Sequence, residues 1–361
     1  VAAGASHTLI LTQSTETTQA PAPYGAGTPS LGGQVWAFGD NSHGQLGIGN
    51  EEALPEDDVT PRMVLKGQSA SDSYYLNSVI AIAAGGDHSV AVRSDGSVYA
   101  WGDNASGQLG VGNDNSTGLP VHVLKGESTG ASDYMENAVA VSAGTNHTLI
   151  LVRIERSNAL EDGTTKGIHT EVYAMGDNSY GQLGIWSTDV SSANYVPRRV
   201  RGTADTANGG APNPDKLGAT GEGDPIYGSE GHQELIIGIA AGYDQSFAVS
   251  QNGVLYAWGE NTNGQLGITP AGITGEKAED PRTTPVEVVR GLSVTTEVGR
   301  EDILYPVRAV AAGNTHAVAV KEDGSVWSFG GTGEDYSIGD ADTYQHIYPV
   351  QTGAYRMNLM V

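Results

Sequence analysis

Four histidines recur at equivalent positions in the chain, and histidine is the side chain most often used for metal binding and for proton transfer near neutral pH. Each stands three residues after the glycine of an Ala-Gly pair: His7, His88, His147 and His316. A fifth copy of the segment carries Gln245 instead. Because each copy supplies one ring, the histidines would lie too far apart to share a metal ion. We interpret them as structural hydrogen-bonding groups near a strand turn.

Carboxylates and amides that could bind calcium recur in the same way, as Asp-Asn pairs that begin at Asp40, Asp103 and Asp177. Each pair follows a glycine that ends an apolar run and precedes a Gly-Gln-Leu-Gly sequence. Side chains of this type bond their own backbone and tolerate left-handed conformations. We therefore predict that the pairs form turns and bind no metal.

Two acidic inserts are also candidate calcium ligands, but they lack the regular oxygen spacing of a dedicated loop. We interpret them as solvated charge and leave calcium as the alternative. Their acidic residues are Glu51, Glu52, Glu56, Asp57 and Asp58 in one insert and Asp335, Asp340 and Asp342 in the other.

The sequence has no phosphate-binding Walker loop and no His-Glu-x-x-His metal-binding motif. We expect a protein that is not an enzyme, with no catalytic, cofactor-binding or metal-binding residues. Glycosylation tripeptides begin at Asn104, Asn115 and Asn146, but the first and third lie inside repeated motifs. We give them little weight.

Composition narrows the choice of fold and partner. The 361 residues include 51 glycines and only 17% charged side chains, which favours short strands joined by tight turns. The formal net charge of -24 would repel phosphate backbones and anionic lipid, so we expect no nucleic-acid partner. Cysteine is absent, which excludes disulfides and thiolate sites. No apolar run of about 18 residues exists to span a membrane, and Val1 opens directly into a repeat, as expected of a processed or excised chain.

Three motifs recur in fixed order and must position the residues above. The first is Ala-Ala-Gly or Ser-Ala-Gly with the histidine or Gln245, followed by an apolar run. The second is a β-branched and aromatic run that ends in glycine, at residues 35–41, 98–104, 172–178, 255–261 and 326–330. Gly-Gln-Leu-Gly follows the first four copies and is missing from the fifth. The third motif is Pro-x-x-Val, which begins at Pro61, Pro120, Pro197 and Pro285 and has a shorter echo at Pro349.

Each repeat therefore contains three or four strand signals. Residues 89–93 and 97–101, around Ser94-Asp95-Gly96, predict a hairpin with a glycine turn. Four such strands make one propeller blade, and a single blade cannot bury both faces, so blades must stack around an axis. We expect the small Ala-Ala-Gly strand where space is tightest.

The order of these motifs resembles the repeats of the regulator of chromosome condensation family, and the chain is similar to its bacterial and extracellular members. The resemblance covers essentially the whole chain and implies an all-β fold, a β-propeller of four-stranded antiparallel blades in one domain over 1–361. Family members usually have about seven blades. Here five repeats are visible, approximately 1–79, 80–138, 139–235, 236–306 and 307–361, with long loop insertions at 14–33, 153–170, 202–234 and 291–304.

The two ends of the chain read as halves of one repeat boundary, because 357–361 followed by 1–4 aligns with 136–144. We favour a ring in which the last strand meets the first and no sheet edge is exposed. The alternatives are a chain cut from a continuous array and a head-to-tail polymer in which one copy completes the next.

For function we expect a scaffold whose loops bind protein or carbohydrate on or outside a microbial cell, with cytoplasmic location still open. High acidity, scarce lysine, lack of cysteine and Ser/Thr-rich inserts favour this. One alternative is a structural subunit of a surface array or extracellular fibre, favoured by the matching termini. Another is an intracellular regulator such as an exchange factor for a small GTPase, which the family resemblance implies.

Overall fold

The computed structural model describes ten segments: 1–12, 32–49, 60–67, 75–126, 133–156, 167–201, 235–268, 281–289, 303–331 and 346–352. Within them the chain forms five separate four-stranded antiparallel sheets and one short 3-10 helix, η1 (Ser192–Tyr195). This confirms the all-β prediction of four-stranded blades. Helices with the length and apolarity to cross a membrane are absent from the described segments.

Each sheet uses four strands that are consecutive in the chain. The first sheet contains β1 (Ala2–Ala3), β2 (His7–Leu11), β3 (Val35–Gly39) and β4 (Arg62–Met63). The second contains β5 (Val79–Ala84), β6 (His88–Arg93), β7 (Val98–Gly102) and β8 (Thr117–His122). The third contains β9 (Ala138–Ala143), β10 (His147–Arg156), β11 (Gly167–Gly176) and β12 (Arg198–Arg199). The fourth contains β13 (Ile236–Ala241), β14 (Gln245–Ser250), β15 (Leu255–Gly259) and β16 (Arg282–Glu287). The fifth contains β17 (Val307–Ala312), β18 (His316–Lys321), β19 (Val326–Gly330) and β20 (His346–Gln351).

The hairpin between β6 and β7 forms as predicted. Gly96 N–H donates to the carbonyl of Arg93 at 2.9 Å, and Gly96 has a φ of +82°, which favours glycine. Asp95 Oδ1 accepts the Ser97 N–H at 3.0 Å, so the side chain closes the turn from within.

Proline marks the outer edge of the blades. Pro120 lies inside β8 and Pro285 inside β16, and each is the fourth and outermost strand of its sheet. Proline has no N–H to donate, so a strand that contains it is tolerated where one side needs no partner. The Pro-x-x-Val motif is therefore an edge-strand signal.

The predicted loop at 153–170 is wrong at both ends. β10 and β11 pair in continuous register from His147 opposite Gly176 to Arg156 opposite Gly167, which extends the strands into the insert. Apolar residues alternate with polar ones in this stretch, at Ile154 and Ile168, so it can continue a hairpin despite its polar composition. The inserts at 14–31, 202–234 and 291–302 lie outside the described residues.

Successive sheets pack face to face, and each has a forward face toward the next sheet and a backward face toward the previous one. We call the contact between two successive sheets a junction and number the junctions from the N-terminus. At the fourth junction, Phe247 and Val249 on the forward face of the fourth sheet form one buried cluster with Ala317, Ala319 and Phe329 on the backward face of the fifth. Trp101 and Trp258, on backward faces, are fully buried and donate their indole N–H to the carbonyls of Gln45 and Gln182, each at 2.9 Å. The core is thus divided among the junctions.

The innermost strands approach one another closely. A Cβ on Gly85 would lie 2.5 Å from the carbonyl oxygen of Gly144, and one on Gly144 would lie 2.5 Å from that of Gly242. Backbone bonds cross the same gap, from Gly86 N to Gly144 O at 3.2 Å and from Tyr243 N to Gly313 O at 3.1 Å. This confirms that the Ala-Gly motif occupies the tightest place.

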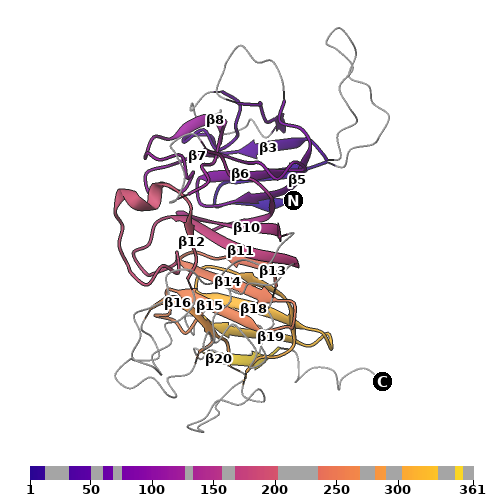
Figure 1. Cartoon of the computed structure of the whole chain (residues 1–361), viewed down its shortest axis with the longest axis vertical. Helices are drawn as coiled ribbons and strands as arrows, with labels where there is room; N and C mark the ends of the chain where they lie inside the picture. The colour runs from indigo at the N-terminus through magenta and orange to yellow at the C-terminus, as the bar shows by residue number, and fades with distance from the viewer. Residues whose placement is uncertain are drawn as a thin grey trace.

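The five sheets form an open stack. Figure 1 shows the first two sheets toward one end of the long axis and the fifth sheet at the other. The three atoms nearest to a Cβ on Gly313 all belong to the ring of His316, and no described residue of the fifth sheet forms a backbone hydrogen bond to the first. The favoured ring closure is therefore not seen in the described segments; residues 353–361, which carry half of the predicted boundary, lie outside them.

Candidate functional site

The loop after the third strand has the same internal frame in the first four blades. The Asn of the Asp-Asn or Glu-Asn pair is fully buried, and its Oδ1 accepts the backbone N–H of the Leu in Gly-Gln-Leu-Gly. The distances are 3.0 Å for Asn41 to Leu46, 2.9 Å for Asn104 to Leu109, 3.0 Å for Asn178 to Leu183 and 2.9 Å for Asn261 to Leu266. Turn formation is thereby confirmed for these pairs.

The buried Gln of each loop joins the two ends of the frame. Gln45 accepts the His43 N–H at 2.9 Å through Oε1 and donates to Asp40 Oδ2 at 2.9 Å through Nε2. The same donation joins Gln108 to Asp103 at 2.7 Å and Gln182 to Asp177 at 2.8 Å. In the fourth loop Glu260 replaces the aspartate, and Gln265 Nε2 has no partner among the described residues. The shorter Asp side chain therefore matches this frame better than Glu.

At two junctions the side-chain amide nitrogen of the loop Gln also lies within hydrogen-bond distance of carboxylates from two successive blades. Gln45 Nε2 lies 3.3 Å from Asp87 Oδ1, and Gln182 Nε2 lies 3.3 Å from Asp244 Oδ1. Burial, followed by the charges of Asp177 and Glu260, raises the pKa of Asp244 to about 6. Burial opposes ionisation of Asp40, but hydrogen bonds from Ser42 and Gln45 outweigh it and lower the pKa of Asp40.

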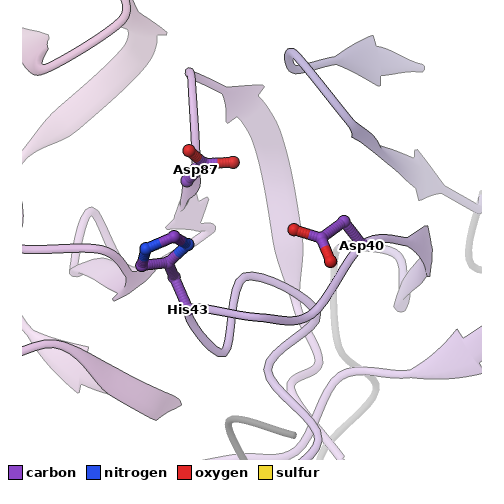
Figure 2. Close-up of side chains that lie close together, drawn as sticks. All are labelled: Asp40, His43 and Asp87. Atoms are coloured by element: carbon purple, nitrogen blue, oxygen red, sulfur yellow. The ribbon is translucent and has the colours of Figure 1, made fainter. Parts of the chain in front are cut away.

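The first junction adds a histidine. Figure 2 shows Asp40 and His43 on one loop and Asp87 on the neighbouring loop, and one ligand atom from each lies within 4.8 Å of the others. Two oxygens and an imidazole nitrogen are a donor set that zinc accepts. The Gln45 amide already bridges the carboxylates, however, and the equivalent Gln182 does so at a junction that has Tyr180 where the first has His43. The amide therefore explains the carboxylate pairing without an ion.

Sequence reasoning missed this group because its members come from two repeats. Asp87 and Asp244 directly precede the histidine or glutamine position of the next blade, and that placement was the available signal. The acidic residues at 51–58 and 335–342 lie outside the described segments.

Three of the four recurrent histidines form the structural hydrogen bonds that the sequence predicts, and each bond reaches a hydroxyl on the next blade, a partner that was not predicted. Nε2 lies 2.9 Å from Ser89 Oγ for His7, 2.9 Å from Thr148 Oγ1 for His88 and 3.0 Å from Ser246 Oγ for His147. Each hydroxyl in turn donates to the carbonyl of the loop Gln on the earlier blade, at 2.8, 2.9 and 2.8 Å. The hydroxyl must then accept from the ring, so the proton is on Nε2.

Burial lowers the pKa of these rings to about 4 for His7, about 3 for His88 and about 4 for His147. They are therefore neutral at physiological pH, and their Nδ1 atoms have no partner in the described residues. A neutral, buried ring that donates from Nε2 fits a structural role.

At the fourth junction different residues form the contact between the blades. Ala317 stands where the other blades have a hydroxyl, and Gln245 replaces the histidine. Gln245 Nε2 instead donates to the carbonyls of Gly313 at 2.8 Å and Asn314 at 3.1 Å. A histidine on one blade thus faces a serine or threonine on the next, whereas Gln245 faces Ala317. His316, on the last blade, has no hydrogen-bond partner for its ring among the described residues.

These features together define a β-propeller repeat protein: consecutive four-stranded sheets, loops framed by buried Asn and Gln, and hydrogen bonds from three histidines to a hydroxyl of the next blade. The chain belongs to the RCC1-like domain family, whose model matches residues 1–356.

Similar proteins share this region but are longer than the match. The human protein "Probable E3 ubiquitin-protein ligase HERC6" is 27% identical over 300 residues, which are 82% of this chain and 21% of that protein. The Arabidopsis thaliana "Ultraviolet-B receptor UVR8" is 26% identical over 295 residues, covering 75% of this chain and 57% of the receptor. The chain thus spans from about a fifth to just over half of these relatives. The crystal structure of human WBSCR16 matches 97% of this chain and 65% of its own, with a TM-score of 0.58 and 18% identity, which supports the fold.

Proposed function

We propose that this chain is a protein-interaction scaffold that binds its partner through the edge formed by the loops after the third strands. The observation that carries the proposal is a constant frame with variable tips. In each loop the buried Asn and Gln hold two intervening residues at the surface: Ser42-His43, Ala105-Ser106, Ser179-Tyr180 and Thr262-Asn263. Surface loops held by a rigid frame are where binding specificity usually resides.

The third junction combines exposed tyrosines with carboxylates, so we propose it as the main binding site on this edge. Tyr180 is 39% exposed and Tyr243 is 47% exposed, and they belong to the two loops that Gln182 joins through Asp177 and Asp244. Exposed tyrosine provides contact area that is typical of binding hot spots, and carboxylates beside it favour a cationic group. The net charge of -24 supports the same preference. We infer a partner protein that presents arginine or lysine to this junction.

We further propose a location on or outside a microbial cell, with carbohydrate as the second ligand class. The acidity, scarce lysine and Ser/Thr-rich inserts of the sequence support both ideas. Cell fractionation with an antibody to the chain tests the location: recovery in the cytoplasm alone would reject it.

A binding assay on the purified full chain tests the interaction edge. The probes are matched synthetic peptides that are arginine-rich, lysine-rich, neutral or acidic, together with a glycan panel. We expect the basic peptides to bind and to weaken as salt increases, because exposed charges are screened. Tyr180→Ala and Tyr243→Ala should each weaken binding about tenfold, the size expected of a hot-spot aromatic.

Tyr75→Ala is the matched control, since Tyr75 is 45% exposed but lies in the connection from β4 to β5, at the opposite edge of the blade. It should leave binding unchanged. Equal losses in all three variants, or equal binding of acidic and basic peptides, would reject the proposed edge. Binding confined to the glycan panel would replace the protein partner with carbohydrate.

A further inference from the structure

The three glycosylation tripeptides of the sequence lie in very different surroundings. Asn104 is fully buried, Asn146 is half-buried and Asn115 is exposed. Asn115 belongs to an irregular segment just before β8, whereas Asn146 directly precedes β10. An enzyme that attaches a sugar must reach the side-chain amide nitrogen of the asparagine, so such sites lie on surface loops. Exposure alone therefore favours Asn115.

The side chain of Asn104 is already used inside the protein. Its Nδ2 donates to the carbonyls of Asn113 at 2.8 Å and Asn115 at 3.1 Å, and its Oδ1 accepts the N–H of Leu109 at 2.9 Å. Both amide hydrogens and the amide oxygen are therefore occupied. A sugar on this nitrogen would displace at least one buried hydrogen bond, so the folded chain does not offer Asn104 as an acceptor.

The tripeptide at Asn146 has no available hydroxyl, and the hydroxyl is a required part of the motif. Thr148 supplies it and is fully buried. Its Oγ1 lies 2.9 Å from His88 Nε2 and donates to Gln108 O at 2.9 Å. The carbonyl of Asn146 also accepts the N–H of Asp177 at 2.8 Å. This tripeptide is thus held within the hydrogen bonds between the second and third blades.

Asn115 differs from both. Its side chain is exposed, and its amide forms no hydrogen bond to any residue of the described segments. The backbone around it is nevertheless fixed, because its N–H donates to Asn113 Oδ1 at 2.9 Å and its carbonyl accepts from Asn104. Thr117, which supplies the hydroxyl of this tripeptide, is half-buried at the start of β8. The buried Asn104 therefore holds the loop from which Asn115 is exposed.

The third blade has the same loop support without the tripeptide. Asn178 Nδ2 donates to the carbonyls of Ser187 at 2.7 Å and Asp189 at 3.2 Å, so Asp189 takes the place of Asn115. Asp189 is exposed and lies outside regular secondary structure, and Ser191 follows two residues later. A single substitution at this position would complete a tripeptide in a loop of matching support.

We propose that Asn115 is a site of N-linked glycosylation, an inference that rests on the proposed location on or outside the cell. The sugar donor is a glycan joined to a lipid diphosphate. Asn115 Nδ2 forms a bond to the anomeric carbon, and the bond from that carbon to the diphosphate oxygen breaks. The electron pair leaves with the lipid diphosphate, and one amide hydrogen leaves as a proton. The glycan is bulky and stands on the second blade's part of the interaction edge.

Site mapping on the full chain recovered from its own cells tests the proposal. Treatment with an amidase specific for N-linked glycans leaves aspartate where a glycosylated asparagine stood, and mass spectrometry of the peptides locates the change. We expect the change at Asn115 and none at Asn104 or Asn146. Asn115→Gln and Thr117→Ala should each abolish it, and the control Thr117→Ser should retain it.

Two negative results have different meanings. A chain recovered on or outside the cell with unmodified Asn115, or with a glycan at Asn104 or Asn146 instead, would overturn the site alone. A chain recovered only in the cytoplasm would reject the proposed location and the glycan together, because the site depends on that location.

A gain-of-site variant tests whether the loop selects the position. Asp189→Asn completes a tripeptide with Ser191 and should add a second glycan in the same cells. In a reconstituted reaction with an oligosaccharyltransferase and a lipid-linked glycan, short synthetic peptides that span each natural tripeptide should all react. The folded, unmodified full chain should react at Asn115 alone. A folded chain that stays unmodified at Asn115, or an Asn115 peptide that fails to react, would overturn the proposal.

Discussion

His88 Nε2 lies 2.9 Å from Thr148 Oγ1, so a neutral imidazole on the second blade donates to a hydroxyl on the third. The hydroxyl of Thr148 donates a hydrogen bond to Gln108 O at 2.9 Å, which connects the loop frame of the second blade to the inner strands of the third. The same pair of hydrogen bonds is present at three of the four junctions, and the fourth has Gln245 and Ala317 instead. Exchanging the residues of one junction for those of the fourth therefore tests what the hydrogen bonds contribute.

Replacing His88 by glutamine should lower the free energy of unfolding by about 1–3 kcal/mol, the usual effect of breaking a buried hydrogen-bond chain. Adding Thr148→Ala should recover part of the loss, because the pair then copies Gln245 and Ala317 at the fourth junction. Urea unfolding of both single variants and the double variant measures the coupling. Strictly additive losses would show that residue matching across a junction contributes nothing.

Stability should fall as the pH is lowered from about 6.5 toward 4. The pKa values of His7, His88 and His147 are depressed by burial to about 4, 3 and 4, whereas the unfolded chain binds protons near the ordinary value of 6.5. The unfolded state therefore binds more protons in this window, at a cost to stability of up to about 1.4 kcal/mol per pH unit for each histidine. Urea unfolding across pH 4 to 7.5 tests this, and His88→Gln should flatten the slope; an unchanged slope would contradict the assigned neutral state.

Asp244 should have the opposite effect on the pH dependence of stability, because its contribution falls as the pH rises. Its pKa is raised to about 6, so the stability it contributes is present below the ordinary value of 3.8 and is lost as the pH rises through 6. Asp244→Asn should stabilise the chain by about 3 kcal/mol at pH 8, since a shift of one unit corresponds to about 1.4 kcal/mol. The gain should vanish at pH 3.5. Thermal unfolding at both pH values gives the comparison, and an equal gain at each would mean that the charge of Asp244 is not the cause.

The inner strands should reject a side chain at Gly85. Gly85→Ala places a Cβ 2.5 Å from Gly144 O and 2.3 Å from His88 Cε1, so we expect a loss of about 3 kcal/mol from overpacking. Gly238→Ala is the control, because its Cβ would have no neighbour closer than 3.9 Å. Chemical denaturation of the two variants should separate them clearly. Similar stabilities would show that the inner strands can move apart at little cost.

Much of the fold follows from local pattern. Gly96 and Asp95 specify their hairpin because a left-handed glycine and a turn-forming carboxylate act within a few residues of chain. The buried Asn and Gln frames are equally local, since Asn41 and Leu46 are five residues apart. By contrast, the polar composition of residues 153–170 predicts a loop, whereas β10 and β11 extend into this segment because each supplies the other with a pairing partner.

The sequence by itself determined the number of repeats, the blade strands and the structural role of the histidines, because each depends on spacing within one repeat. Tertiary structure alone decided which carboxylates meet, since Asp40 and Asp87 belong to different blades and are joined only through Gln45. It also decided that the described sheets form an open stack, where pattern alone favoured a closed ring. The rotation from one blade to the next is a property of side-chain packing at each junction, and no single repeat encodes it.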